Sequence, residues 1–89
     1  MAKSMRAKVY VSGIEKFSAE SESIKFSAIG KSGSYPSDGS DEDNTYAKFS
    51  PMAHFNINIA NPELIGQFQL GDKMYVDFIP VEDATQRLA

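Results

Sequence analysis

Apolar and polar side chains alternate along much of this chain, which is the pattern of strands that bury one face. The clearest alternation runs through residues 53–59, where four apolar side chains are separated by more polar ones. At residues 45–49 the pattern is shorter, and Pro51 limits it because proline cannot donate to a sheet ladder. Five strands are predicted in all, at residues 6–12, 24–28, 45–49, 53–59 and 74–79.

A short helix is predicted between the last two strands. Asn61 is a good N-cap, Pro62 suits the first helical position, and Glu63 lies where the helix dipole favours an anion. Gly71 and Asp72 then form a turn into the last strand.

These elements predict a mainly β fold, a small antiparallel barrel or sandwich of about five strands, with the short helix closing one end. An OB-like or SH3-like barrel fits the strand count, and a two-sheet sandwich fits it nearly as well. One domain is expected over residues 1–81, followed by a polar C-terminal tail at residues 82–89. Seven side chains are predicted to point inward: Val9, Val11, Phe26, Phe55, Ile57, Val76 and Phe78.

Residues 30–44 form a long polar loop rich in glycine, serine and aspartate. Loops of this length are often functional, and small domains commonly make their contacts there. The predicted partner-binding residues are Tyr35, Asp38, Asp41, Glu42 and Asp43. The carboxylates could also imitate phosphates or bind calcium, but Phe49 stands where an EF-hand needs its bidentate glutamate. A solvated or docking loop is therefore favoured, and no metal site is expected.

Composition narrows the function classes. The 89 residues include no cysteine and one histidine, which excludes disulfides, thiol catalysis and most multi-histidine metal sites within one chain. Residues 31–34 resemble half of a phosphate cradle but lack the full P-loop pattern, and no nucleophile motif is present. No apolar run approaches the ~18 residues of a membrane span. We expect a non-enzymatic protein without a cofactor and without membrane contact.

Basic and aromatic side chains at outward strand positions suggest an alternative function. A single-strand-binding barrel uses such side chains for phosphate contact and base stacking. The residues that would do so here are Lys8, Tyr10, Lys25, Tyr46 and Lys48. The net charge of −3 argues against broad nucleic-acid binding, so docking on protein chains is the preferred interpretation. An OB-like nucleic-acid or nucleotide-binding barrel, acting against a host system, is the alternative.

Three segments of the chain together resemble a group of small tailed-bacteriophage proteins without an assigned activity. The segments are SYPSDGSDEDNTYAKFSP at residues 34–51, IANPELIGQF at residues 59–68 and GDKMYVDFIP at residues 71–80. Because these motifs are structural, the resemblance assigns no catalytic residue. It implies a phage protein made in the bacterial host cytoplasm, either a small virion component or an assembly factor. It also implies a homo-oligomer or docking on other particle proteins, since a thin-cored domain gains stability from its neighbours.

Overall fold

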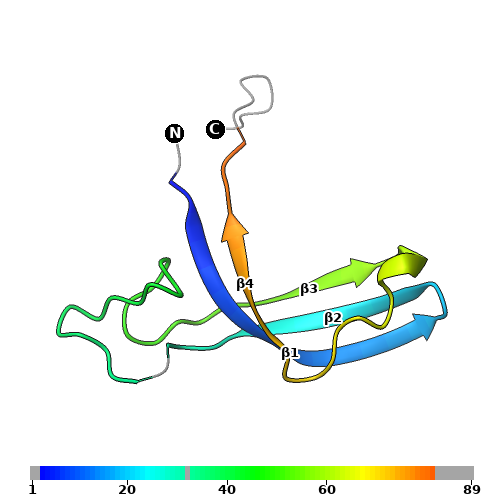
Figure 1. Ribbon diagram of the computed structural model, residues 1–89, viewed down its shortest axis with the longest axis horizontal. Coiled ribbons are helices and arrows are strands. Elements are labelled where there is room, and N and C mark those ends of the chain that lie inside the picture. The colour runs from blue at the N-terminus through cyan, green and yellow to red at the C-terminus, as the bar shows by residue number, and fades with distance from the viewer. Residues whose placement is uncertain (1–2, 32, 82–89) are drawn as a thin grey trace.

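The computed structural model describes residues 3–31 and 33–81 and shows one antiparallel sheet of four strands (Figure 1). The strands are β1 (Met5–Ser18), β2 (Ser21–Ala28), β3 (His54–Ile59) and β4 (Lys73–Phe78). Their order across the sheet is β3-β2-β1-β4, so β3 and β4 lie at its two edges. A turn of 3-10 helix, η1 (Pro62–Leu64), stands between β3 and β4.

The long strand β1 changes partners along its length. Its first part, residues 5–10, pairs with β4. From Val9 onward it pairs with β2, and a register shift of the β-bulge type lies between Val11 and Gly13. A bulge bends the strand that contains it and increases its twist. The first part of β1 and all of β4 rise together away from β2 and β3 (Figure 1), and we call these two segments the β1/β4 ribbon.

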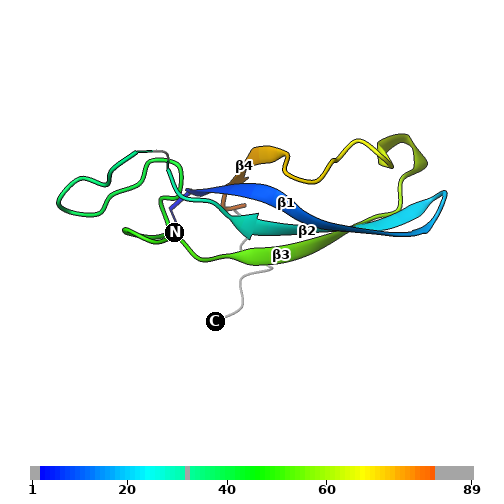
Figure 2. The same cartoon turned by 90° about the horizontal axis from the view of Figure 1, so that it is seen from below.

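One face of the sheet, here called the inner face, carries the hydrophobic core. Its buried apolar side chains are Ala7, Val9, Val11, Ile24, Phe26 and Ile59. The segment between β3 and β4 passes over this face (Figure 2), and its Phe68 ring meets the Phe26 ring edge-on, with 5.7 Å between centroids. Phe55 stacks on the same Phe26 ring at 5.0 Å. The core is therefore one face of the sheet, covered by this irregular segment and by Tyr46 from the connection between β2 and β3. The opposite face is here called the outer face.

The predicted antiparallel and mainly β character is confirmed, but the number of strands and the helix differ. Residues 45–49 form turns and bends instead of a strand: the Ala47 N–H donates to the Asn44 carbonyl at 3.1 Å, and Phe49 adopts a left-handed φ of 63° that a strand does not allow. Asn61 caps η1 by accepting a hydrogen bond from the Glu63 N–H, yet the helical turn ends at Leu64. Gly66 follows with a φ of 84°, which directs the chain across the inner face.

The sheet is open within the described residues, whereas the sequence predicted a barrel or a two-sheet sandwich. β3 and β4 are the two edge strands, and their outer edges do not pair with each other as they would in a closed barrel. The predicted C-terminal tail, residues 82–89, lies outside the described residues.

All seven side chains that were predicted to point inward share the inner face. Of these, Val9, Val11 and Phe26 are buried, as expected. Ile57 on β3 and Phe78 on β4 remain 49% and 45% exposed. The open sheet explains this difference, because an edge strand of a single sheet has a neighbour on one side only.

Candidate docking surface

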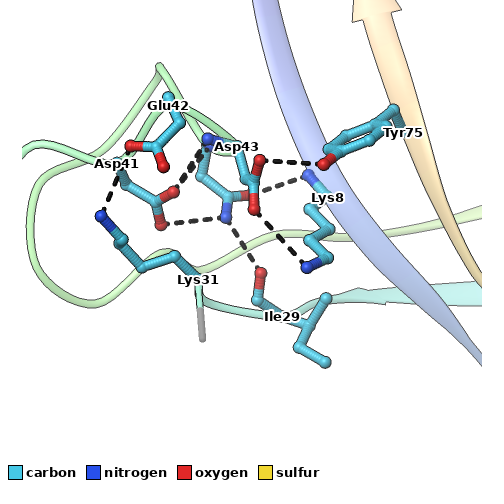
Figure 3. Close-up of polar contacts among 8 residues, drawn as sticks. Lys8, Ile29, Lys31, Asp41, Glu42, Asp43 and Tyr75 are labelled. Carbon is cyan, nitrogen blue, oxygen red and sulfur yellow. Dashed lines mark hydrogen bonds and ion pairs between the residues drawn. The ribbon is translucent and has the colours of Figure 1, made fainter. Parts of the chain in front are cut away.

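Asn44 anchors the long loop to the sheet. Its side-chain Oδ1 accepts a hydrogen bond from the Lys8 N–H at 2.8 Å, and its Nδ2 donates to the Ile29 carbonyl at 2.9 Å and to Asp41 Oδ2 at 3.1 Å (Figure 3). Thr45 continues the contact, since its N–H donates to the Arg6 carbonyl at 3.0 Å and its hydroxyl accepts from the Arg6 N–H at 2.9 Å. The loop therefore occupies the place of a strand beside the first part of β1.

The carboxylates of the loop are largely engaged within the chain. Asp41 is buried, and its Oδ1 accepts hydrogen bonds from the backbone N–H groups of Asp43 and Asn44. Burial alone would raise the pKa of Asp41, but hydrogen bonds from the Asn44 side chain and from backbone N–H groups outweigh it, so the pKa lies below its usual value. Glu42 is exposed and lies 3.4 Å from Lys31 Nζ.

Asp43 connects the loop to the outer face of the β1/β4 ribbon. One of its oxygens accepts a hydrogen bond from the Tyr75 hydroxyl at 3.0 Å, and the other lies 3.5 Å from Lys8 Nζ (Figure 3). The hydrogen bond to Asp43 raises the pKa of Tyr75. Asp43 is thus paired with side chains of the sheet, whereas Asp41 accepts hydrogen bonds from within the loop, and both carboxylates support the loop conformation.

Of the five predicted partner-binding residues, Asp38 and Glu42 are exposed, and Tyr35 is half-buried. The Asp38 carboxylate accepts a hydrogen bond from the Ser40 N–H at 3.0 Å, and this bond lowers its pKa. The Tyr35 ring lies 5.9 Å from the Phe49 ring, so it is part of the packing of the loop. The structure therefore brings these five residues into one loop, but it exposes only part of the predicted surface.

A second polar cluster joins the two strands of the ribbon on the outer face. Arg6 donates from Nε and from Nη2 to the two carboxylate oxygens of Asp77, at 2.7 and 3.1 Å. The Arg6 guanidinium also lies over the Tyr75 ring, 4.6 Å from its centroid. The hydrogen bond from Arg6 lowers the pKa of Asp77. A bidentate fork and a cation–π contact thus connect the two strands of the ribbon on this face.

The free end of this braced ribbon is apolar. Met5 and Phe78 are cross-strand neighbours on the inner face and are 42% and 45% exposed. Ile79 and Val81 follow and are 71% and 84% exposed. A shallow hollow of about 370 Å³ lies here, lined by Lys3, Met5, Phe78, Ile79 and Pro80. We call Met5, Phe78, Ile79 and Val81 the apolar corner; contiguous exposed apolar side chains of this kind mark interaction sites.

The five residues of the nucleic-acid alternative do not form one surface. Lys8, Tyr10 and Lys25 share the outer face, although Lys8 is already paired with Asp43. Tyr46 packs against the core on the inner side; its hydroxyl is buried without a hydrogen-bond partner, and burial raises its pKa. Lys48 is exposed in the loop, at a hollow that Asp41 and Glu42 also line.

The described residues contain neither a metal-binding cluster nor a membrane-spanning helix. Residues 3–31 and 33–81 contain no group of three or more histidine, cysteine, aspartate or glutamate side chains placed to hold a metal ion. In the same part of the chain, no helix has the length and apolar character needed to cross a membrane.

The contacts made by Asn44, Arg6 and Asp77 were not predicted from the sequence. Alternation placed Arg6 and Asp77 on polar strand positions, but nothing local indicates a pair between residues 71 positions apart. Asn44 follows an acidic run, so it was assigned to a solvated loop, while its contact with Lys8 spans 36 positions. Such contacts become visible only when the strand order is known.

Comparison with protein-family models, with curated proteins and with solved structures found no match to this chain.

Proposed function

We propose that this protein is a non-enzymatic assembly module that docks on other protein chains through the β1/β4 ribbon. The observation that carries the proposal is the apolar corner at the end of the ribbon. Scattered apolar side chains are common on protein surfaces, but here Met5 and Phe78 are cross-strand neighbours, and Ile79 lines the same hollow as both. They also stand on a ribbon whose strands are cross-linked by Arg6 and Asp77 and contacted by the loop, and a preorganised surface loses less entropy on binding.

The thin core supports the same proposal. A small domain with one covered face gains stability when a partner buries further apolar surface. The resemblance to tailed-bacteriophage proteins supports a place in a virion or in its assembly, where identical docking events are repeated. The bacterial cytoplasm is then the compartment in which the protein is made.

The test compares two aspartate substitutions of exposed apolar residues. Ile79→Asp places a charge in the apolar corner, whereas Met52→Asp places one at an exposed position before β3. Sedimentation velocity over a range of concentrations measures self-association, and mass spectrometry of purified particles from a phage that carries the gene measures incorporation. We expect Ile79→Asp to lose association or incorporation and Met52→Asp to retain both. A native protein that is monomeric at every concentration and absent from particles would refute the proposal, as would equal behaviour of the two variants.

A second candidate function rests on the outer face, where Lys8, Tyr10 and Lys25 lie together. In this alternative the protein binds single-stranded nucleic acid by phosphate contact and stacking. A fluorescence-anisotropy titration with oligonucleotides tests this candidate. It is carried out at about 50 mM salt, because phosphate contacts weaken as the salt concentration rises and binding is therefore strongest at low salt. Absence of binding under that condition eliminates this candidate.

A further inference from the structure

Among the described residues, the outer edge of β4 presents a regular set of backbone groups without a partner. The Val11 N–H donates to the Asp72 carbonyl at 2.8 Å, which places that pair among the hydrogen-bonded pairs of the β1/β4 ladder. Hydrogen-bonded pairs alternate along an antiparallel ladder, so Met74, Val76 and Phe78 bond to β1. The remaining residues, Lys73, Tyr75 and Asp77, direct their N–H and C=O groups to the open edge.

The opposite edge of β1 confirms this alternation. The backbone N–H groups of Arg6 and Lys8 donate hydrogen bonds to the loop, to Thr45 Oγ1 at 2.9 Å and to Asn44 Oδ1 at 2.8 Å. Because these groups point away from β4, the β4 residues opposite them, Asp77 and Tyr75, direct their backbone groups outward. A row of unpaired backbone groups on an edge strand is a template for another strand.

We propose that β4 pairs antiparallel with β4 of a second copy of this chain, about a two-fold axis at Tyr75, so that two sheets become one. This inference rests on the proposed docking function and names its partner. In this register Lys73 of each copy lies opposite Asp77 of the other, and Tyr75 lies opposite its own equivalent. The three outward residues of each strand then exchange backbone hydrogen bonds with the other strand. On the inner face, Met74 lies opposite Val76.

Charge complementarity favours this register over the alternative registers of the same two strands. Lys73 and Asp77 lie two positions before and two positions after Tyr75, so a two-fold axis at Tyr75 places opposite charges together twice. A slip by one residue pair sets Lys73 or Asp77 against Tyr75 and leaves a charge without its partner. Parallel pairing in register sets like charges together, which destabilises a cross-strand pair.

The side chains on the outer face are available for this contact. Among the described residues, Lys73 is exposed and takes part in no ion pair. Asp77 already accepts from Arg6, but two carboxylate oxygens offer about four acceptor positions, so a second cation can be added. Tyr75 is 52% exposed, and aromatic cross-strand pairs stabilise antiparallel sheets. The other edge strand, β3, carries His54, Asn56 and Asn58 on the outer face and has no pair of lysine and aspartate at such positions.

The first test removes one backbone donor from the edge. Tyr75→Pro eliminates the outward N–H without removing a hydrogen bond to β1, and proline is tolerated at such edge positions. Tyr75→Val is the matched control, since both variants lose the side-chain contacts with Asp43 and Arg6. Sedimentation velocity should show dimers for the native protein and for Tyr75→Val and loss of the dimer for Tyr75→Pro, with circular dichroism spectra that show folded protein in each case. Equal dimerisation of the two variants would overturn the proposal.

The second test measures which residues of the two β4 strands lie opposite each other, and it uses a cysteine substitution instead of proline. The chain has no cysteine, so a single introduced cysteine can form a disulfide only with another copy. The two-fold axis places the Tyr75 Cα atoms of two copies about 5.5 Å apart, within the span of a disulfide. We expect oxidised Tyr75→Cys to give a covalent dimer and Asn56→Cys, on the outer face of β3, to remain monomeric under the same conditions. No more cross-linking for Tyr75→Cys than for Asn56→Cys would overturn the proposal, and preferential cross-linking of Asn56→Cys would identify the other edge as the interface.

Failure of edge pairing is distinguishable from failure of the docking function. If Ile79→Asp abolishes association but Tyr75→Pro does not, docking through the apolar corner stands and β4 pairing is wrong. If the native protein is monomeric and Tyr75→Cys does not cross-link, β4 pairing is wrong, and incorporation into particles decides the docking function separately.

Discussion

Replacing Asn44 by alanine tests whether one side chain holds the long loop against β1. Asn44 is fully buried, and its amide makes three hydrogen bonds, to the Lys8 N–H, the Ile29 carbonyl and Asp41. Alanine leaves all three partners without a substitute in the folded protein. We therefore expect the variant to be strongly destabilised even though it removes no apolar contact.

The magnitude follows from the number of bonds. A buried hydrogen bond contributes about 1 kcal/mol net, and a buried group left unpaired costs about 1–3 kcal/mol. With three bonds lost, the free energy of unfolding should fall by about 3 kcal/mol, a large share of the roughly 5–15 kcal/mol typical of a domain. For a domain of this size the melting temperature should fall by about 15 °C.

Urea denaturation followed by circular dichroism measures the change in free energy, with Asn58→Ala as the matched control on the exposed outer face of β3. Hydrogen exchange adds a local measurement, because the Lys8 amide should lose its protection in the Asn44→Ala variant. A free energy of unfolding within about 0.5 kcal/mol of the native value would refute the role assigned to Asn44, since that is the range of ordinary surface substitutions.

Three further predictions concern the loop, the core and acid stability. Gly39→Ala should unfold the loop or destabilise the domain by about 1–3 kcal/mol, because φ is 75° and a Cβ there would overlap the Phe49 ring; a native melting temperature would contradict this. Phe26→Ala should cost about 3–5 kcal/mol in urea denaturation, and half-buried Phe55→Ala about half as much; an equal cost would show that β3 is covered in solution. Because the folded-state pKa of Asp41 lies below the ordinary 3.8, its stabilising contribution is complete above that pH and is lost as the pH falls through the lower, folded-state pKa. The melting temperature should therefore fall below about pH 4, less steeply for Asp41→Asn, and identical pH profiles would contradict the hydrogen bonding described.

The alternation of apolar and polar residues was sufficient to locate the four strands, because it depends only on residues within each strand. Alternation located the strands around residues 6–12, 24–28, 53–59 and 74–79, because burying one face of a strand imposes a period of two on its own residues. The same pattern assigned the inner-face residues correctly, and Asn61 indicated the start of η1. The alternation at residues 45–49 was misleading, since contacts from elsewhere hold that segment in turns.

Only the tertiary structure decided which segments meet. An alternating pattern is compatible with a closed barrel, a sandwich or an open sheet. It shows which side chains of a strand are buried, but it does not show which strands lie next to one another. The contacts of Arg6 with Asp77 and of Lys8 with Asn44 join residues 71 and 36 positions apart, so no local pattern encodes them. The same order of strands leaves β4 at an edge and Met5 beside Phe78, both exposed among the described residues. The candidate docking surface therefore arises from strand order, which depends on the packing of the whole chain.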